Sequence, residues 1–195
     1  DKALTSPTDE RLNEFVGLVR WLKECGAPID GLAMRVSAGH PYLAPKAMDQ
    51  RLNQLTAHVD LPLTIAGLDV DAPSPEVQAR RMSDMLLLFA SRPEVEAIYL
   101  SEIWAPLAHK PRNALFDPKL APKPAVETVK KRFLADWQTE VETITDANGE
   151  AVVEGFTGTY TITVGQEPKT TVVTGELDPA GAKVNVVLLP APGAF

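Results

Sequence analysis

The sequence has few of the residues from which cross-links and metal sites are built. It holds one cysteine, Cys25, and three histidines, His40, His58 and His109, among 195 residues. A single cysteine excludes an internal disulfide, and the histidines lie too far apart along the chain for a zinc-ligand spacing. No glycine-rich phosphate loop follows any candidate strand. We therefore expect neither a metal nor an organic cofactor.

Excess positive charge and long apolar runs are also lacking. The formal net charge is −7 and the isoelectric point is about 5.0, so the chain lacks the basic surface with which proteins bind nucleic acid or anionic membranes. No uninterrupted apolar stretch approaches the length of a membrane-spanning helix. The sequence opens at Asp1 without the pattern of a signal peptide. We expect no nucleic-acid partner and no membrane contact.

What the chain does contain is an alternation of helical and extended patterns. Residues 61–71 form a short apolar run bounded by Pro62 and by a proline-rich turn, which is typical of a buried parallel strand. Further strands are expected near 32–34 and over 94–100. Apolar residues at helical spacing predict helices over 10–25, 45–58, 75–91 and 125–137. This order is typical of an α/β fold.

From residue 140 onward the composition changes to threonine, valine and glycine, and the helical period stops. The Asn148-Gly149 pair inside 142–153 is a hairpin-turn signal, and residues 155–164 alternate with a period of two. Residues 170–174 and 184–189 are two more candidate strands. We therefore divide the chain into an α/β part, residues 1–139, and a small all-β part, residues 140–195.

Three stretches of the α/β part carry specific motifs. Residues 18–34 read LVRWLKECGAPIDGLAM, residues 65–70 read IAGLDV, and residues 97–117 keep Trp104, Pro111 and a closing ALFD. These resemble the phrases LVxWLxxxGxPIDGIGxQ, ITELDV and GILLWGFWEGAHWRPDAALFD of glycoside hydrolase family 10, the endo-β-1,4-xylanases. The resemblance implies a partial TIM (β/α)8 barrel with about the last three strands and four helices. It also implies that a small β-sandwich-like subdomain follows, as in some bacterial xylanases.

The resemblance further implies that the catalytic positions are altered. The family nucleophile is the glutamate of the strand motif, and Gly67 stands at that position. The strand that carries the acid/base glutamate is absent, and a retaining glycosidase needs both carboxylates. Glu102, where the family has glycine, is a weak replacement candidate. No catalytic residue is therefore predicted, and an active enzyme is the less favoured interpretation.

The same resemblance places candidate substrate contacts at the mouth of the barrel. Arg35 and Ser37 stand where the family has glutamine and histidine, and Ser101 and His109 replace two of its tryptophans. Loss of aromatic walls removes apolar surface on which sugar rings stack. The predicted substrate-binding residues are Trp104, His109, Arg35 and His40.

Two hypotheses of function follow. The first is a catalytically degenerate, xylanase-like protein that acts as a glycan-binding or structural and assembly module. Three barrel strands alone expose two unpaired edges and an inner face that we expect to be apolar, so a second chain or a second copy is expected to complete the barrel, and a polysaccharide is the expected ligand. The alternative is the C-terminal half of a split, active endo-β-1,4-xylanase that hydrolyses plant-type polysaccharide. An extracellular or secreted location is expected from the resemblance alone.

Overall fold

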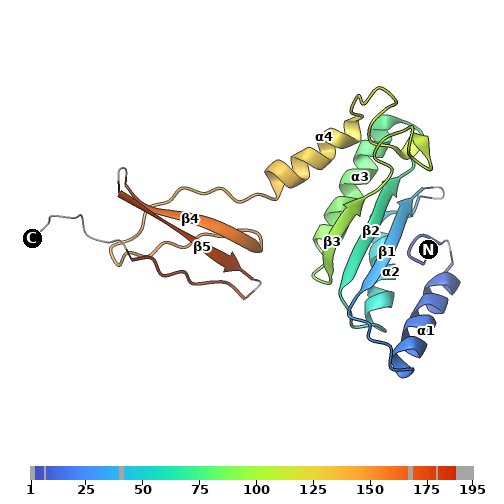
Figure 1. Cartoon of the computed structure of the whole chain (residues 1–195), viewed down its shortest axis with the longest axis horizontal. Coiled ribbons are helices and arrows are strands. Elements are labelled where there is room, and N and C mark those ends of the chain that lie inside the picture. Colours follow the sequence, from blue (N-terminus) through green and yellow to red (C-terminus); the bar gives the residue numbers. More distant parts are fainter. Residues whose placement is uncertain (1–2, 7, 40–41, 167–168, 179, 188–195) are drawn as a thin grey trace, which may run out of the picture. The chain divides into compact units, whose positions relative to one another are not determined.

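The computed structural model describes residues 3–6, 8–39, 42–166, 169–178 and 180–187. The chain divides into two units, Asp1–Phe133 and Leu134–Phe195. The first unit is α/β, and the second is a β-hairpin with extended flanking segments (Figure 1). No helix in the described part of the chain is long and apolar enough to cross a membrane.

Three parallel strands form the sheet of the first unit. β1 spans Leu32–Ala38, β2 spans Leu63–Val70 and β3 spans Val95–Leu100, in the spatial order β1-β2-β3. The register pairs the first residues of the three strands with one another, so the strands begin level. The buried strand expected at 61–71 is therefore the central strand, β2.

The described part of this unit contains four α-helices. They are α1 (Glu10–Glu24), α2 (Pro45–Thr56), α3 (Pro75–Ala90) and α4 (Pro124–Lys131). Of these, α2 and α3 connect the strands, while α1 precedes β1 and α4 packs against α3. Strand–helix–strand crossovers of this kind build TIM barrels, but the sheet of this unit stays open (Figure 1). The predicted partial barrel is confirmed. Its last helix ends earlier than the predicted range 125–137, because a π-helical turn over Arg132–Asp136 replaces the α-helix there.

Two helix ends show why the chain turns where it does. Ser74 caps α3, since its Oγ accepts a hydrogen bond from the Val77 N–H at 3.3 Å, and Pro75 takes the first helical position. At the C-terminal end of α1, Gly26 follows the C-cap residue Cys25. Gly26 has a φ of 81°, a conformation that glycine adopts readily. These residues direct the chain from β2 into α3 and from α1 towards β1.

The core of the first unit lies between the sheet and its helices. Apolar side chains of α2, α3, β1 and β2 are inaccessible or nearly inaccessible to solvent. The largest group comprises Val36, Met48, Leu52, Leu55, Ile65, Leu68, Met82, Met85, Leu86 and Phe89. The methionines and leucines of α3 are therefore core residues, as their helical spacing indicated.

The opposite face of the sheet differs from our expectation. Successive residues of a strand point to opposite faces, so the side chains that alternate with the core residues form the open face. They are those of Ala33, Arg35, Ser37, Thr64 and Ala66, which are exposed or half-buried. Among the described strand residues of this unit, Tyr99 is the only large hydrophobic side chain that is exposed, at 61%. The expectation of an apolar inner face was wrong, because the described residues of this face other than Tyr99 are small or polar.

The second unit contains one antiparallel hairpin. β4 (Gly158–Gln166) pairs with β5 (Lys169–Leu177) along their whole lengths. These strands correspond to the predictions at 155–164 and 170–174. The strand predicted at 184–189 is wrong over 184–187, where the backbone pairs with no described strand, and 188–189 lie outside the described residues.

Segment 142–153 forms the predicted turn at Asn148-Gly149 but contains no strand. A β-sandwich needs two packed sheets, and the described part of this unit has the β4–β5 sheet alone. The sandwich therefore stays a prediction. The two units divide between Phe133 and Leu134, whereas the change in composition lies at residue 140.

Candidate functional site

The carboxyl ends of parallel strands are where TIM-barrel enzymes hold their active sites. In this unit three polar side chains meet at that edge of the sheet from distant parts of the sequence. Arg35 comes from β1, Asp69 from the end of β2, and Glu102 from the loop that follows β3. That loop continues through a 3-10 turn over Pro111–Asn113 before the chain reaches α4. This cluster is the candidate site.

Gly67 lies on β2 beside Arg35, its register partner on β1. A Cβ atom added at Gly67 would lie 3.3 Å from Arg35 Cγ and 3.5 Å from Ser101 Oγ. The first of these distances is tight, so the stem of Arg35 already occupies space that a larger side chain at position 67 would need. The position that the motif assigns to the nucleophile thus has no carboxylate and has a cationic side chain next to it.

Arg35 and Glu102 form the central ion pair of the site. Arg35 Nη2 donates to Glu102 Oε1 at 2.9 Å and lies 3.9 Å from Asp69 Oδ2. Glu102 Oε2 accepts a hydrogen bond from the Lys110 N–H at 3.0 Å. The Lys110 N–H lowers the pKa of Glu102 and the Arg35 guanidinium adds to that effect, whereas burial opposes it. Glu102 is therefore an anionic acceptor at neutral pH.

The backbone of Glu102 is also unusual. Its φ is 54°, in the left-handed region that residues with a side chain seldom adopt. The resembling motif has glycine there, the residue for which this conformation is easiest. The glutamate keeps the conformation because its carboxylate is held from two sides, by β1 and by its own loop.

Asp69 joins the strand ends to that loop. It is 1% exposed, and its Oδ1 accepts hydrogen bonds from Ser37 Oγ at 2.7 Å and from Asn113 Nδ2 at 2.6 Å. Lys110 Nζ in turn donates to Ser37 Oγ at 2.9 Å. Asp69 Oδ2 makes no hydrogen bond with the described residues and is buried, 3.9 Å from Arg35 Nη2, so neither carboxylate oxygen is open to the hollow.

A hollow of about 450 Å³ opens beside the ion pair. Its lining residues are Arg35, Glu102, Ile103, Trp104, Leu107, Ala108 and His109. Three predicted substrate-binding residues, Trp104, His109 and Arg35, thus lie around one hollow, together with the weak catalytic candidate Glu102. His40, the fourth, lies outside the described residues.

The hollow combines an apolar wall with hydrogen-bonding groups. Leu107 is 82% exposed and Ile103 is 46% exposed, while the Arg35 side chain is 52% exposed and carries guanidinium N–H donors. The charges of Arg35 and Glu102 compensate each other. A ligand that fits these walls is uncharged and has hydroxyl groups on one side and an apolar C–H face on the other. A sugar ring has this pattern.

Part of this lining gave no signal in the sequence. Ile103, Leu107 and Ala108 are aliphatic, whereas aromatic side chains are the ones from which a sugar platform is usually inferred. Lys110 acts through its backbone N–H, and every residue except proline has that group. Only the path of the loop brings these groups to the site.

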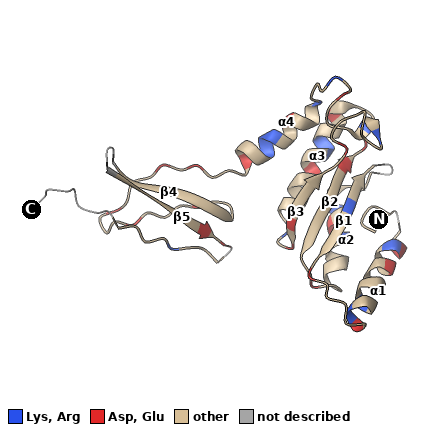
Figure 2. Cartoon of the chain, viewed as in Figure 1, with Lys and Arg blue, Asp and Glu red and all other residues tan. Residues whose placement is uncertain are grey.

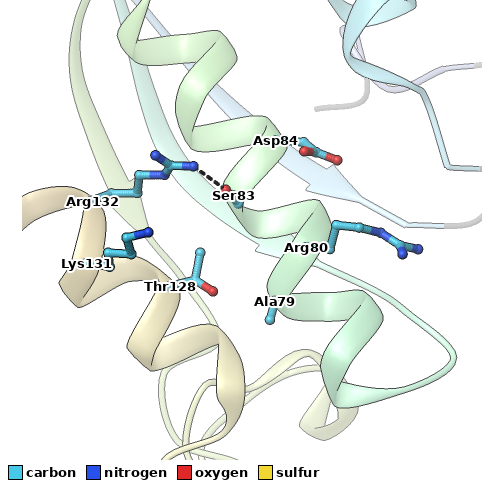
Figure 3. A pocket seen from close by; sticks show the side chains of 7 residues that line it. All are labelled: Ala79, Arg80, Ser83, Asp84, Thr128, Lys131 and Arg132. Atoms are coloured by element: carbon cyan, nitrogen blue, oxygen red, sulfur yellow. Dashed lines mark hydrogen bonds between the residues drawn. The ribbon is translucent and has the colours of Figure 1, made fainter. Parts of the chain in front are cut away.

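A second hollow, of about 290 Å³, lies between α3 and α4 (Figure 3). It is lined by Ala79, Arg80, Ser83, Asp84, Thr128, Lys131 and Arg132. Arg132 Nη2 donates to Ser83 Oγ at 2.9 Å across it. It contains none of the predicted site residues. In neither hollow, nor elsewhere among the described residues, do three or more His, Cys, Asp or Glu side chains gather as a metal site would require.

Comparison with known proteins identifies the architecture. The model of glycosyl hydrolase family 10 matches residues 4–132, about two thirds of the chain. The anti-sigma-I factor RsgI6 of Acetivibrio thermocellus is 26% identical over 160 residues, which are 80% of this chain and 20% of that protein. This chain therefore spans about a fifth of that relative.

Solved xylanases share the fold of the first unit. Xylanase 10B from Thermotoga petrophila, solved in complex with xylobiose, superposes with a TM-score of 0.53 and 21% identity over 62% of this chain and 41% of its own. An endo-1,4-β-xylanase from Penicillium canescens superposes with a TM-score of 0.55 and 17% sequence identity. The match covers 66% of this chain and 43% of the xylanase chain. The chain spans less than half the length of these structures. It belongs to glycosyl hydrolase family 10 and holds part of that family's barrel.

Proposed function

We propose that this chain is a catalytically degenerate member of the family that binds a glycan at the strand ends without hydrolysing it. The nucleophile position carries the proposal: Gly67 has no carboxylate, and the stem of Arg35 lies beside it. A retaining glycosidase attacks the sugar with one carboxylate while a second protonates the leaving group. Removal of such a nucleophile lowers the rate by several orders of magnitude.

The two carboxylates at the site do not replace the missing pair. Asp69 accepts hydrogen bonds from Ser37 and Asn113, and Glu102 is paired with Arg35. A general acid at neutral pH needs a raised pKa, but the pKa of Glu102 is lowered, chiefly by a backbone N–H. Neither carboxylate is therefore suited to the acid or the nucleophile role.

The hollow beside these residues supports a binding role. Its walls suit an uncharged sugar, and the Arg35 side chain at its edge is 52% exposed and offers guanidinium N–H groups to a ligand hydroxyl. One family structure holds xylobiose. The relative RsgI6 is by name an anti-sigma-I factor. A module that recognises a glycan is consistent with the xylobiose in that structure and with the name of that relative.

The proposal includes a polypeptide that completes the barrel. The outer strands β1 and β3 each have one unpaired edge. A TIM barrel has eight strands, so the three strands of this unit need about five more. A second copy of this chain would add only three. A segment or chain that carries the remaining strands therefore fits better, and we propose an extracellular setting, where polysaccharide ligands are found.

The alternative proposal is a split, active endo-β-1,4-xylanase in which that partner supplies the acid/base carboxylate. Retention of Trp104 at the mouth favours it. The position of Gly67 argues against it, because the nucleophile belongs to β2 and β2 is on this chain. A partner would have to supply the nucleophile from a different strand.

Calorimetric titration with xylohexaose tests binding, and a reducing-sugar assay on the same sample tests hydrolysis. We expect binding without release of reducing ends. Leu107→Ser removes an 82% exposed side chain from the hollow, and the loss of about 1 kcal/mol of apolar contact corresponds to roughly fivefold weaker binding. Leu120→Ser is the control, because Leu120 is 61% exposed but lies outside the lining. Equal effects of the two substitutions, or hydrolysis by the unmodified chain, would contradict the proposal.

A further inference from the structure

The net charge of the chain resides in its second unit. Residues 1–133 hold 17 acidic residues (Asp and Glu) and 17 basic residues (Lys and Arg). Residues 134–195 hold nine acidic residues and two basic residues. The second unit therefore accounts for the whole formal charge of −7. Its acidic residues before β4 follow one another along the chain (Figure 2). They are Asp136, Glu140, Glu142, Asp146, Glu150 and Glu154, and no lysine or arginine lies among them.

Two extended arms, residues 140–145 and 150–154, flank the turn at Asp146–Gly149. The turn itself is well formed, since Asp146 Oδ1 accepts the N–H groups of Asn148 and Glu150 and Gly149 has a φ of 78°. In the described chain, segment 140–156 has two hydrogen bonds between backbone groups: the Asp146 N–H donates to Glu150 O at 2.8 Å and the Gly149 N–H to Asp146 O at 3.0 Å. Beyond the turn, the backbone groups of both arms have no backbone partner among the described residues.

The arms also expose large apolar side chains. Ile144 is 91% exposed and Val152 is 93% exposed, and Val141 and Val153 are 57% and 45% exposed. These β-branched residues favour strands, and several exposed together mark an interaction surface. Unpaired backbone groups next to exposed β-formers are the features of an edge that accepts a further strand.

We propose that the arms are a docking site for an extended segment of a basic polypeptide, which pairs with an arm as an added β-strand. Charge selects this occupant, because Glu140, Glu142 and Glu154 lie among the exposed apolar residues. Glu150 is also acidic, but it pairs with Lys183 Nζ at 3.5 Å. A strand that presents lysine or arginine beside small apolar residues complements them. A second copy carries the same charge of −7 on this unit, and like charges on facing strands are destabilising.

The test uses the full chain and the peptide Lys-Val-Lys-Thr-Lys-Val-Lys-Thr. Calorimetry should show one-to-one binding, and hydrogen exchange should slow at least tenfold at amides of residues 141–145 or 150–154. A peptide with proline at the two threonine positions keeps the charge but lacks two strand donors, so it should bind at least tenfold more weakly. A peptide with glutamate in place of lysine should not bind.

Matched variants locate the binding surface. Ile144→Thr with Val152→Thr removes exposed apolar surface from the arms and should weaken binding of the lysine peptide about tenfold. Val172→Thr, at a 61% exposed position on β5, should leave it unchanged. Equal binding of the proline peptide would overturn the proposal, as would protection confined to β4 and β5. A dimer without peptide whose amides at residues 141–145 or 150–154 are protected from exchange would also overturn it, since a second copy would then occupy the arms.

Discussion

Replacement of Glu102 by glycine sets two opposing effects against each other. Glu102 has a φ of 54°, which disfavours a residue with a side chain by about 1 kcal/mol relative to glycine. Glycine relieves that strain. It also removes the acceptor of the Lys110 N–H, at 3.0 Å, and the ion pair with Arg35, at 2.9 Å. The sign of the change in stability shows which effect is larger.

The polar contacts should outweigh the strain. A hydrogen bond from a backbone N–H to a buried carboxylate contributes about 1.5–3 kcal/mol. The side chain of Arg35 is 52% exposed, so solvent screens its pair with Glu102 and we assign that pair about 0.5 kcal/mol. After subtraction of the strain term, Glu102→Gly should lower the free energy of unfolding by about 1–2.5 kcal/mol.

Urea denaturation of the full chain, followed by far-ultraviolet circular dichroism, measures this change because all four α-helices belong to the first unit. Leu120→Gly is the matched control. Leu120 has a φ of 62° and is 61% exposed, so glycine relieves similar strain without removing an ion pair. The control should leave stability unchanged or raise it by up to about 1 kcal/mol. A rise in stability for Glu102→Gly would refute the reasoning about its carboxylate.

Two further predictions concern pH and helix capping. The pKa of Glu102 is lowered in the folded chain, so the stability from its carboxylate is present above its unfolded pKa of about 4.3 and is lost as pH falls through the folded pKa. The unmodified chain should therefore lose more stability than Glu102→Gln between about pH 5 and pH 3, and coincident pH profiles in urea titrations would contradict this. Ser74→Ala removes the hydrogen bond to the Val77 N–H and should lower the free energy of unfolding by about 1 kcal/mol in the same assay. An unchanged urea midpoint would show that the cap contributes nothing.

The fold of the first unit could be predicted because its signals are local. The apolar run of β2 and the Ser74-Pro75 pair before α3 each determine structure within a few residues. Whether the open face of the sheet is apolar or polar could not be predicted from the same local signals. Alternation shows that Met34 and Arg35 point to opposite faces, but only the packed helices show which face is open and that Arg35 belongs to it.

The second unit was less predictable because strand pairing is not local. Val184–Val187 has the composition of a strand, yet it pairs with no described strand. The arms around Asp146 have strand composition and a formed turn but no backbone pairing beyond it. Composition predicts that such segments can form strands, and a partner for their backbone groups decides whether they do.

The site was predictable where family motifs locate residues one by one. Trp104, His109 and Arg35 were assigned to the barrel mouth from motif positions, and the structure places them around one hollow. The lining by Leu107 and the contact of the Lys110 N–H depend on the path of the loop after β3. The family motifs do not specify the path of this loop, so these contacts could be identified only from the structure.

Addition of the missing barrel strands shows whether the absence of a carboxylate at Gly67 abolishes hydrolysis. The chain is mixed with a polypeptide that carries the first five strands of a family-10 xylanase, including its acid/base glutamate, and reducing sugar released from xylan is measured. The account predicts no release above that of the polypeptide alone, because Gly67 leaves β2 without a nucleophile. Release that depends on this chain and disappears when the acid/base glutamate of the polypeptide is replaced by glutamine would contradict the account.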